Sequence, residues 1–199
     1  MLSTLPSTFA LQAHQLSGGP GTQAIIQNLD FSWPAGVSWV GGDEGSGKTT
    51  LLRLLAGDLQ PTHGAVHATR GGVFWADLQS PLHDELTPLA CWDALRAHFP
   101  LWQEDLLQDL TDALSMRPHL HKRLNMLSTG SRRKVMLIAA LASGATVTLL
   151  DQPFVSLDAA SIRFLLEFLA EASQHTRRAW LIADYEAPPG ITLASVLEL

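Results

Sequence analysis

The sequence has one cysteine, no long hydrophobic run and no obvious leader, and each shortage excludes a class of protein. Cys91 alone cannot form a disulfide within the chain, which fits a reducing compartment. The longest apolar run, residues 135–142, is far shorter than the roughly 20 residues that cross a bilayer. The first residues lack the basic region and apolar core of a secretory signal. We therefore expect a cytoplasmic protein.

Basic residues are scarce as well. The chain has 13 Lys and Arg against 19 Asp and Glu, a net charge of −6, which argues against a general grip on a nucleic-acid backbone. Its 199 residues fit a single domain covering residues 1–199. Hydrophobic residues make up 46% of the chain, which indicates either a large core or a buried interface with another chain.

Residues 42–49 form a complete phosphate-binding loop of the pattern G-x-x-x-x-G-K-[ST]. An apolar stretch precedes it and a helix-like run follows it, which is the context that the motif requires. The pattern predicts that Lys48 reaches the β- and γ-phosphates and that the Thr49 hydroxyl binds Mg²⁺. The residues expected to bind ATP are Gly42, Asp43, Glu44, Gly45, Ser46, Gly47, Lys48, Thr49 and Thr50.

Strand-like and helix-like segments alternate around this loop, which predicts an α/β fold with a mixed or parallel sheet. Apolar alternation near the N-terminus predicts an antiparallel strand group at residues 9–13, 25–31 and 37–40 that leads into the central sheet. Further strands are expected at residues 73–75, 146–150 and 179–183. Helices are expected at residues 50–56, 89–99, 103–114, after Ser131 and at 160–173. The strands disappear between residues 81 and 134, which predicts a helical subdomain inserted into the core.

Asp151 directly follows the apolar segment 146–150 and is the next candidate site residue after the phosphate loop. In phosphate-loop NTPases, a carboxylate at the end of such a strand holds Mg²⁺. Alone this pattern is weak, since many buried strands end in Asp. Its value comes from the motifs on either side of it.

Those motifs resemble the ATP-binding-cassette (ABC) ATPases of ABC transporters, over residues 9–185. Residues 127–131, Leu-Ser-Thr-Gly-Ser, are similar to the family signature L-S-G-G-Q, and 155–158 resemble its D-loop. Gln79 stands where the family has its Q-loop glutamine. The resemblance implies that Ser128, Gly130 and Asp158 contribute to ATP binding and that Gln79 serves catalysis and Mg²⁺.

The resemblance also implies partners. Two cassettes pair head to tail, so a second ABC ATPase chain is expected, in a homodimer or a heterodimer, with an integral membrane permease. The protein would then lie on the cytoplasmic face of the cell membrane. The short length and residues 79–89 look most like the ATPase subunit of cytochrome c biogenesis haem exporters.

Two departures concern the catalytic positions that the resemblance implies. Gln152 stands where the family has a Glu that deprotonates the attacking water, and Tyr185 falls where it has a His. An amide orients water without accepting its proton, a loss of about 10²–10⁴-fold in rate. Three explanations of Gln152 stay open: a laboratory substitution, a slow ATPase, and a site that binds ATP without useful turnover. In the last case the chain is either an ATP-gated assembly or regulatory module, or it relies on a competent partner chain for hydrolysis.

Three smaller questions also stay open. Trp75, Trp92 and Trp102 either pack a core or form a surface that docks a membrane subunit. The basic run 132–134 favours a solvated helix turn over a nucleic-acid patch. No aromatic residue that would stack on adenine is evident in residues 17–23, and Trp33 is a doubtful substitute.

Overall fold

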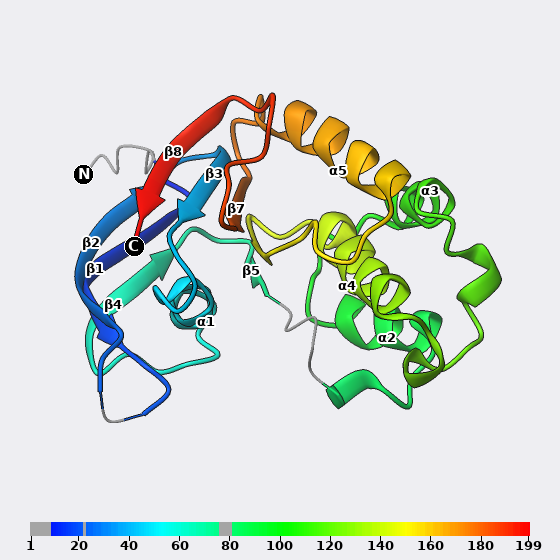
Figure 1. Cartoon of the computed structure of the whole chain (residues 1–199), viewed down its shortest axis with the longest axis horizontal. Coiled ribbons are helices and arrows are strands. Elements are labelled where there is room, and N and C mark those ends of the chain that lie inside the picture. Colours follow the sequence, from blue (N-terminus) through cyan, green and yellow to red (C-terminus); the bar gives the residue numbers. More distant parts are fainter. Residues whose placement is uncertain (1–8, 22, 76–80) are drawn as a thin grey trace, which may run out of the picture.

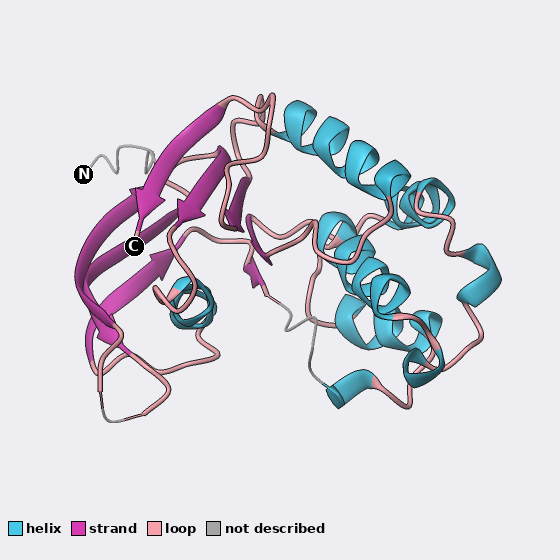
Figure 2. Ribbon diagram, in the orientation of Figure 1, coloured by secondary structure: helices cyan, strands magenta, loops and turns pink. Residues whose placement is uncertain are grey.

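The computed structural model describes residues 9–21, 23–75 and 81–199. Two sheets and helix α1 (Lys48–Ala56) form one part of the molecule, and helices α2 to α5 gather in the other (Figures 1 and 2). The N-terminal end of the described chain and its C-terminus both lie at the sheet part (Figure 1).

The first sheet is antiparallel, with strand order β2-β1-β4. Its strands are β1 (Leu11–Gly18), β2 (Ile26–Trp33) and β4 (His63–Ala68). The predicted antiparallel group is confirmed for residues 9–13 and 25–31. It is wrong for residues 37–40, which pair in parallel within the second sheet, and β4 is an addition that the sequence did not predict. Its outer residues are largely exposed, so the segment has no buried face long enough to give an apolar alternation.

The second sheet is parallel throughout, with order β5-β6-β7-β3-β8. Its strands are β3 (Gly36–Gly41), β5 (Val73–Phe74), β6 (Val147–Asp151), β7 (Ala179–Ala183) and β8 (Leu193–Glu198). The unpredicted β8 is an edge strand that pairs with β3, so the last residue, Leu199, donates its N–H to the Gly41 carbonyl at 3.1 Å. Because all five strands run the same way, the loops after β3, β6 and β7 meet at one edge of the sheet.

Alternation along these strands divides the interior into two cores. On β6 and β7, Leu149 and Leu181 face a core that α1 and the antiparallel sheet complete. Leu150 and Ile182 face the opposite core, which the helices fill. Because alternate residues point to opposite faces, the parallel sheet packs on both sides. Helix α1 lies between the two sheets, and α2 to α5 lie on the other face of the parallel sheet.

The helical part contains α2 (Pro88–Arg96), α3 (Glu104–Ala113), α4 (Thr129–Ala142) and α5 (Ala159–Ala172). Trp92 is 2% exposed and its Nε1–H donates to the Val135 carbonyl at 2.8 Å. Trp75 and Trp102 pack against the two cores. Trp92 is therefore a core residue, whereas Trp75 and Trp102 are partly buried.

Candidate functional site

The phosphate loop connects β3 to α1 through backbone that only glycine adopts easily. Gly42, Gly45 and Gly47 have φ angles of 141°, 79° and 107°, in the region that disfavours L side chains. A Cβ on Gly42 would lie 2.5 Å from Ser46 Oγ, so the turn is also too tight for one. Gly47 caps α1 without a side-chain hydrogen bond, and the first turn carries no acidic residue. The N–H groups at the start of α1 therefore face an anion site.

Lys48 is buried within this loop, with 6% of its surface exposed. Its Nζ donates to the carbonyls of Gly42 at 2.5 Å and Asp43 at 2.8 Å. The ammonium also lies 4.4 Å from the ring centroid of Tyr185, a cation–π distance. The loop carbonyls and the ring thus hold the lysine charge in place beside the positions where phosphates would bind.

Asp151 lies at the end of β6, across from the start of α1. Its Oδ2 accepts a hydrogen bond of 2.6 Å from the Thr49 hydroxyl. Its Oδ1 is buried and has no partner among the described residues. Burial raises the pKa of Asp151, an effect that Thr49, Arg133 and Lys48 oppose.

The donor set around Asp151 fits a hydrated Mg²⁺ bound to a nucleotide. One carboxylate and one hydroxyl are too few to hold a cation alone, and the described residues contain no cluster of three or more His, Cys, Asp or Glu for a metal. Mg²⁺ usually keeps several waters and takes the remaining oxygens from phosphates. The unpartnered Oδ1 of Asp151 is the acceptor that such a water shell would use.

Gln152 and Tyr185 join the phosphate loop around one pocket of about 330 Å³. The other predicted residues that line it are Glu44, Gly45, Ser46, Gly47, Lys48, Thr49 and Thr50. Gln152 has a φ of 45°, and its N–H donates to the Ala183 carbonyl on β7 at 2.8 Å. Ile25, which sequence reasoning missed, adds a 44% exposed apolar side chain to the wall.

Arg133 lies directly behind this pocket, and the prediction that residues 132–134 form a solvated turn is wrong. Arg133 is 5% exposed, and its Nη2 donates to the Gln152 carbonyl at 2.5 Å. Burial lowers the pKa of Arg133, whereas the charges of Asp151 and Asp184 raise it. The guanidinium therefore supports the backbone on which Gln152 is mounted. Arg132 pairs with Asp84, and Lys134 with Asp158 at 2.6 Å.

The residues of the signature lie apart from the phosphate-loop pocket. Ser128 caps α4, and its Oγ accepts the Ser131 N–H at 3.2 Å. A Cβ on Gly130 would lie 2.3 Å from the Ser156 carbonyl oxygen, so glycine lets the signature pack against residues 155–158. Neither residue lines the pocket around Lys48.

Asp158 is likewise engaged within its own chain. It caps α5 by accepting the Ser161 N–H at 2.9 Å, and it pairs with Lys134. These partners, Lys134 first, hold the pKa of Asp158 well below its usual range. Gln79 lies outside the described residues. Trp33 is completely buried, which excludes it as a platform for adenine.

Comparisons with known proteins agree with this geometry. The family profile described as ABC transporter matches residues 26–155. The chain is 35% identical over 168 residues to the cytochrome c biogenesis ATP-binding export protein CcmA of Zymomonas mobilis, covering 82% of this chain and 73% of that protein. It is 30% identical to the taurine import ATP-binding protein TauB of Pseudomonas fluorescens, covering 79% and 64%.

A solved structure described as the ATP binding subunit of an ABC transporter superposes with a TM-score of 0.77. The superposition covers 87% of this chain and 79% of that one, at 23% sequence identity. A likeness at this identity concerns the fold alone.

Proposed function

The chain belongs to the ABC transporter family, as an ABC-type ATPase, and on that premise we propose that it binds Mg-ATP at a head-to-tail dimer interface and drives a separate membrane permease. The observation that carries the proposal is the convergence of the phosphate loop, Thr49 and Asp151 at the carboxyl edge of the parallel sheet. Among the described residues no helix is both long and apolar enough to cross a bilayer.

Each residue of the site has a task that follows from its chemistry. Lys48 would exchange its bonds to the loop carbonyls for bonds to the β- and γ-phosphates. The N–H groups at the start of α1 would bind phosphate oxygens in the field of the helix dipole. Thr49 and Asp151 would hold Mg²⁺, which would neutralise charge on the phosphates. The Gln152 amide would orient water without removing its proton.

The second half of the ATP site would come from the partner cassette. Ser128, Gly130 and the N-terminus of α4 lie away from the pocket of their own chain, so they are free to approach the γ-phosphate of a second chain. Closure would then depend on ATP. The similarity to export proteins of cytochrome c biogenesis favours haem export as the process that closure drives.

The dimer geometry can be tested by cross-linking. In a Cys91→Ser background, which removes the one native thiol, Ser128→Cys is introduced together with Glu44→Cys, an exposed residue that lines the phosphate-loop pocket and has no left-handed φ. We expect a disulfide between two chains when ATP and Mg²⁺ are present and none with Lys48→Ala added. A chain carrying Ser128→Cys alone is the matched control. A cross-link yield independent of ATP would contradict the head-to-tail site.

A second function is favoured by Gln152 and Tyr185, which both line the ATP pocket. Neither side chain is a general base at neutral pH, so ATP would close the dimer and be hydrolysed slowly or not at all. The chain would then be an ATP-gated assembly or regulatory module. Purified protein that binds ATP, dimerises, and turns over fewer ATP than it binds within an hour would favour this function over an energy-coupling subunit.

A further inference from the structure

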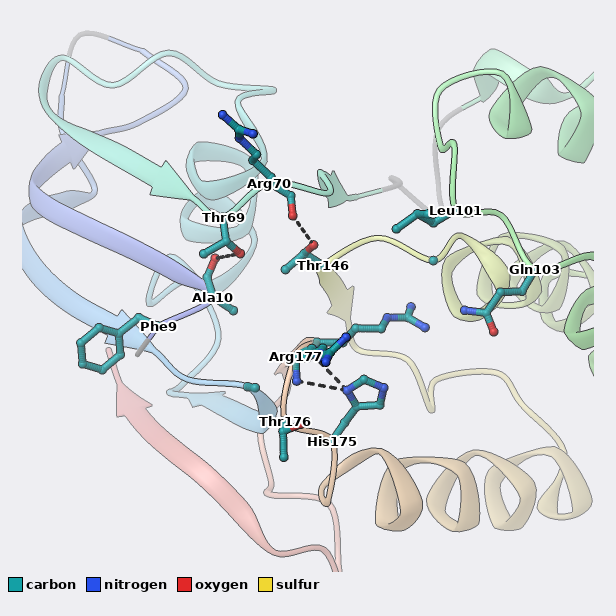
Figure 3. Close-up of a pocket in the computed structure, with 13 residues that line it drawn as sticks. Phe9, Ala10, Thr69, Arg70, Leu101, Gln103, Thr146, His175, Thr176 and Arg177 are labelled. Atoms are coloured by element: carbon teal, nitrogen blue, oxygen red, sulfur yellow. Dashed lines mark hydrogen bonds between the residues drawn. The ribbon is translucent and has the colours of Figure 1, made fainter. Parts of the chain in front are cut away.

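A second pocket lies at the opposite edge of the parallel sheet from the phosphate loop. Its volume is about 520 Å³, within the range of sites for small organic ligands. Its floor includes Thr146 and Arg178, the residues just before β6 and β7, and Figure 3 shows the residues around it. The sheet separates this pocket from Lys48, so a ligand here does not compete for the ATP site.

The lining of this pocket is basic in an acidic protein. Arg70, His175, Arg177 and Arg178 contribute to it, and no Asp or Glu of the described residues does. Within the described residues, none of the three arginines forms an ion pair, whereas the chain as a whole carries a charge of −6. In Figure 3 the guanidinium of Arg70 points away from His175, so Arg70 adds positive charge at the rim.

Arg178 is held rigidly at the pocket although its charge lacks a counterion. Its Nε donates to the Ala145 carbonyl at 2.9 Å, and its guanidinium carbon lies 4.8 Å from the Trp180 ring centroid. Its Nη2 is buried without a hydrogen-bond partner in the described chain. Burial accordingly lowers the pKa of Arg178. An anion in the pocket would supply the opposite charge that this cation lacks.

His175 is also oriented to donate. Its Nδ1 accepts the N–H groups of Arg177 at 3.3 Å and Arg178 at 3.2 Å, as the dashed lines of Figure 3 mark. With Nδ1 occupied as an acceptor, the proton of the neutral ring sits on Nε2, which becomes a donor. Turn 175–178 therefore offers one imidazole donor and two guanidinium groups from four consecutive residues.

The walls are preformed and partly apolar. A Cβ on Gly144 would lie 1.9 Å from the Leu101 carbonyl oxygen, so glycine lets that segment close one side. The Thr146 hydroxyl donates to the Arg70 carbonyl at 2.8 Å and fixes another. Leu101 is 63% exposed and Phe9 40% exposed, which leaves apolar surface beside the cations.

From these observations we propose that this pocket is a binding site for a small organic anion, distinct from the ATP site. A phosphate or carboxylate group lies among Arg177, Arg178 and His175, and an attached apolar group lies against Leu101 and Phe9. The volume exceeds that of inorganic phosphate several-fold, which is why the ligand carries an organic part. This assignment does not rest on the proposed transport function.

The test is a titration of the ¹⁵N-labelled full chain with phenyl phosphate, followed by NMR at the backbone amides of residues 144–146 and 175–178. Inorganic phosphate and phenol, the two halves of the probe, are titrated separately. We expect shifts at these amides and an affinity for phenyl phosphate at least 10-fold higher than for either half. Arg177→Gln, at an exposed position, should weaken binding about 10-fold or more.

Arg163→Gln is the matched control, because Arg163 is an exposed arginine on α5 that does not line the pocket. It should bind the probe as the wild type does, and the spectra themselves report whether each variant is folded. Shifts confined to residues 42–50 would mean that anions bind the phosphate loop only. That outcome, equal affinity for inorganic phosphate, or unchanged affinity in Arg177→Gln would each overturn the proposal.

Discussion

The two edges of the parallel sheet hold anion sites that are built in different ways. At the carboxyl edge, backbone N–H groups of the phosphate loop and one lysine surround the pocket. At the amino edge, side chains do so, with His175, Arg177 and Arg178 from the connection before β7 and Arg70 from the one before β5. A backbone-built site needs glycines at fixed spacing and therefore leaves a motif in the sequence. A site built from side chains of separate loops leaves none.

The largest expected effect is a loss of ATP binding at the carboxyl edge that leaves anion binding at the amino edge unchanged. Lys48→Ala removes a buried cation that would bond to the β- and γ-phosphates, so ATP should bind about 10- to 100-fold more weakly. Anion binding at residues 175–178 should be unchanged, since the sheet lies between the sites. Isothermal titration with ATP and NMR with phenyl phosphate measure the two effects. Parallel losses at both edges would show that the pockets are coupled.

A glycine substitution tests how tightly the wall of the amino-edge pocket is packed. Gly144→Ala should lower the free energy of unfolding by about 2–4 kcal/mol, because its Cβ would overlap the Leu101 carbonyl oxygen at a φ of 68°. Gly190→Ala is the control: its φ is 74°, and a Cβ there meets nothing within 4 Å, so the cost should be about 1 kcal/mol. Urea unfolding measures both, and equal losses would show that the wall is not tightly packed.

Arg133 offers the corresponding test at the carboxyl edge. Arg133→Met keeps most of the side-chain volume but removes the bond to the Gln152 carbonyl, so kcat for ATP should fall about 10-fold with little change in KM. Arg132→Met, in the same helix turn and paired with Asp84, should change kcat less than twofold. A matching loss in both variants would assign the effect to α4 as a whole.

The smallest expected effect concerns pH and the Lys134–Asp158 pair. Because Lys134 lowers the pKa of Asp158 in the folded protein, the pair stabilises the fold above the ordinary Asp pKa of 3.8 and this contribution disappears as pH falls through the folded pKa. Asp158→Asn retains the cap of α5 and removes the charge. Wild type should exceed the variant in stability at pH 7, and the difference should shrink steadily as pH falls from 4 to 2, in urea unfolding. A constant difference would exclude the ion pair as its cause.

The sequence predicted those parts of the molecule that local chemistry determines. The phosphate loop has fixed glycine positions, and Gln152 follows directly from the end of a buried strand. Counting along 180–185 selected Tyr185, which does line the pocket with Lys48. The α/β fold was predicted from the alternation of strand-like and helix-like segments along the sequence.

The parts that the sequence did not predict depend on tertiary contacts. Strand β8 lies at the sheet edge with alternate residues exposed, so its pattern resembles a polar loop. Arg133 belongs to a basic run that the sequence predicts to be solvated. Its burial depends on its contact with the carbonyl of Gln152, which only the folded chain shows. The amino-edge pocket needs residues from five connections and from the segment before β1, and their spacing along the chain does not indicate that they meet.

The most direct measurement is steady-state ATP turnover of the wild type beside Gln152→Glu, with Mg²⁺ and with Lys48→Ala as the blank. If the carboxyl edge is an ABC-type ATP site that lacks only its general base, Gln152→Glu should raise kcat by about 10²-fold or more, with ATP affinity nearly unchanged. Wild-type turnover equal to that of Gln152→Glu would contradict this, because it would mean that the proton of the attacking water is removed without a carboxylate at position 152.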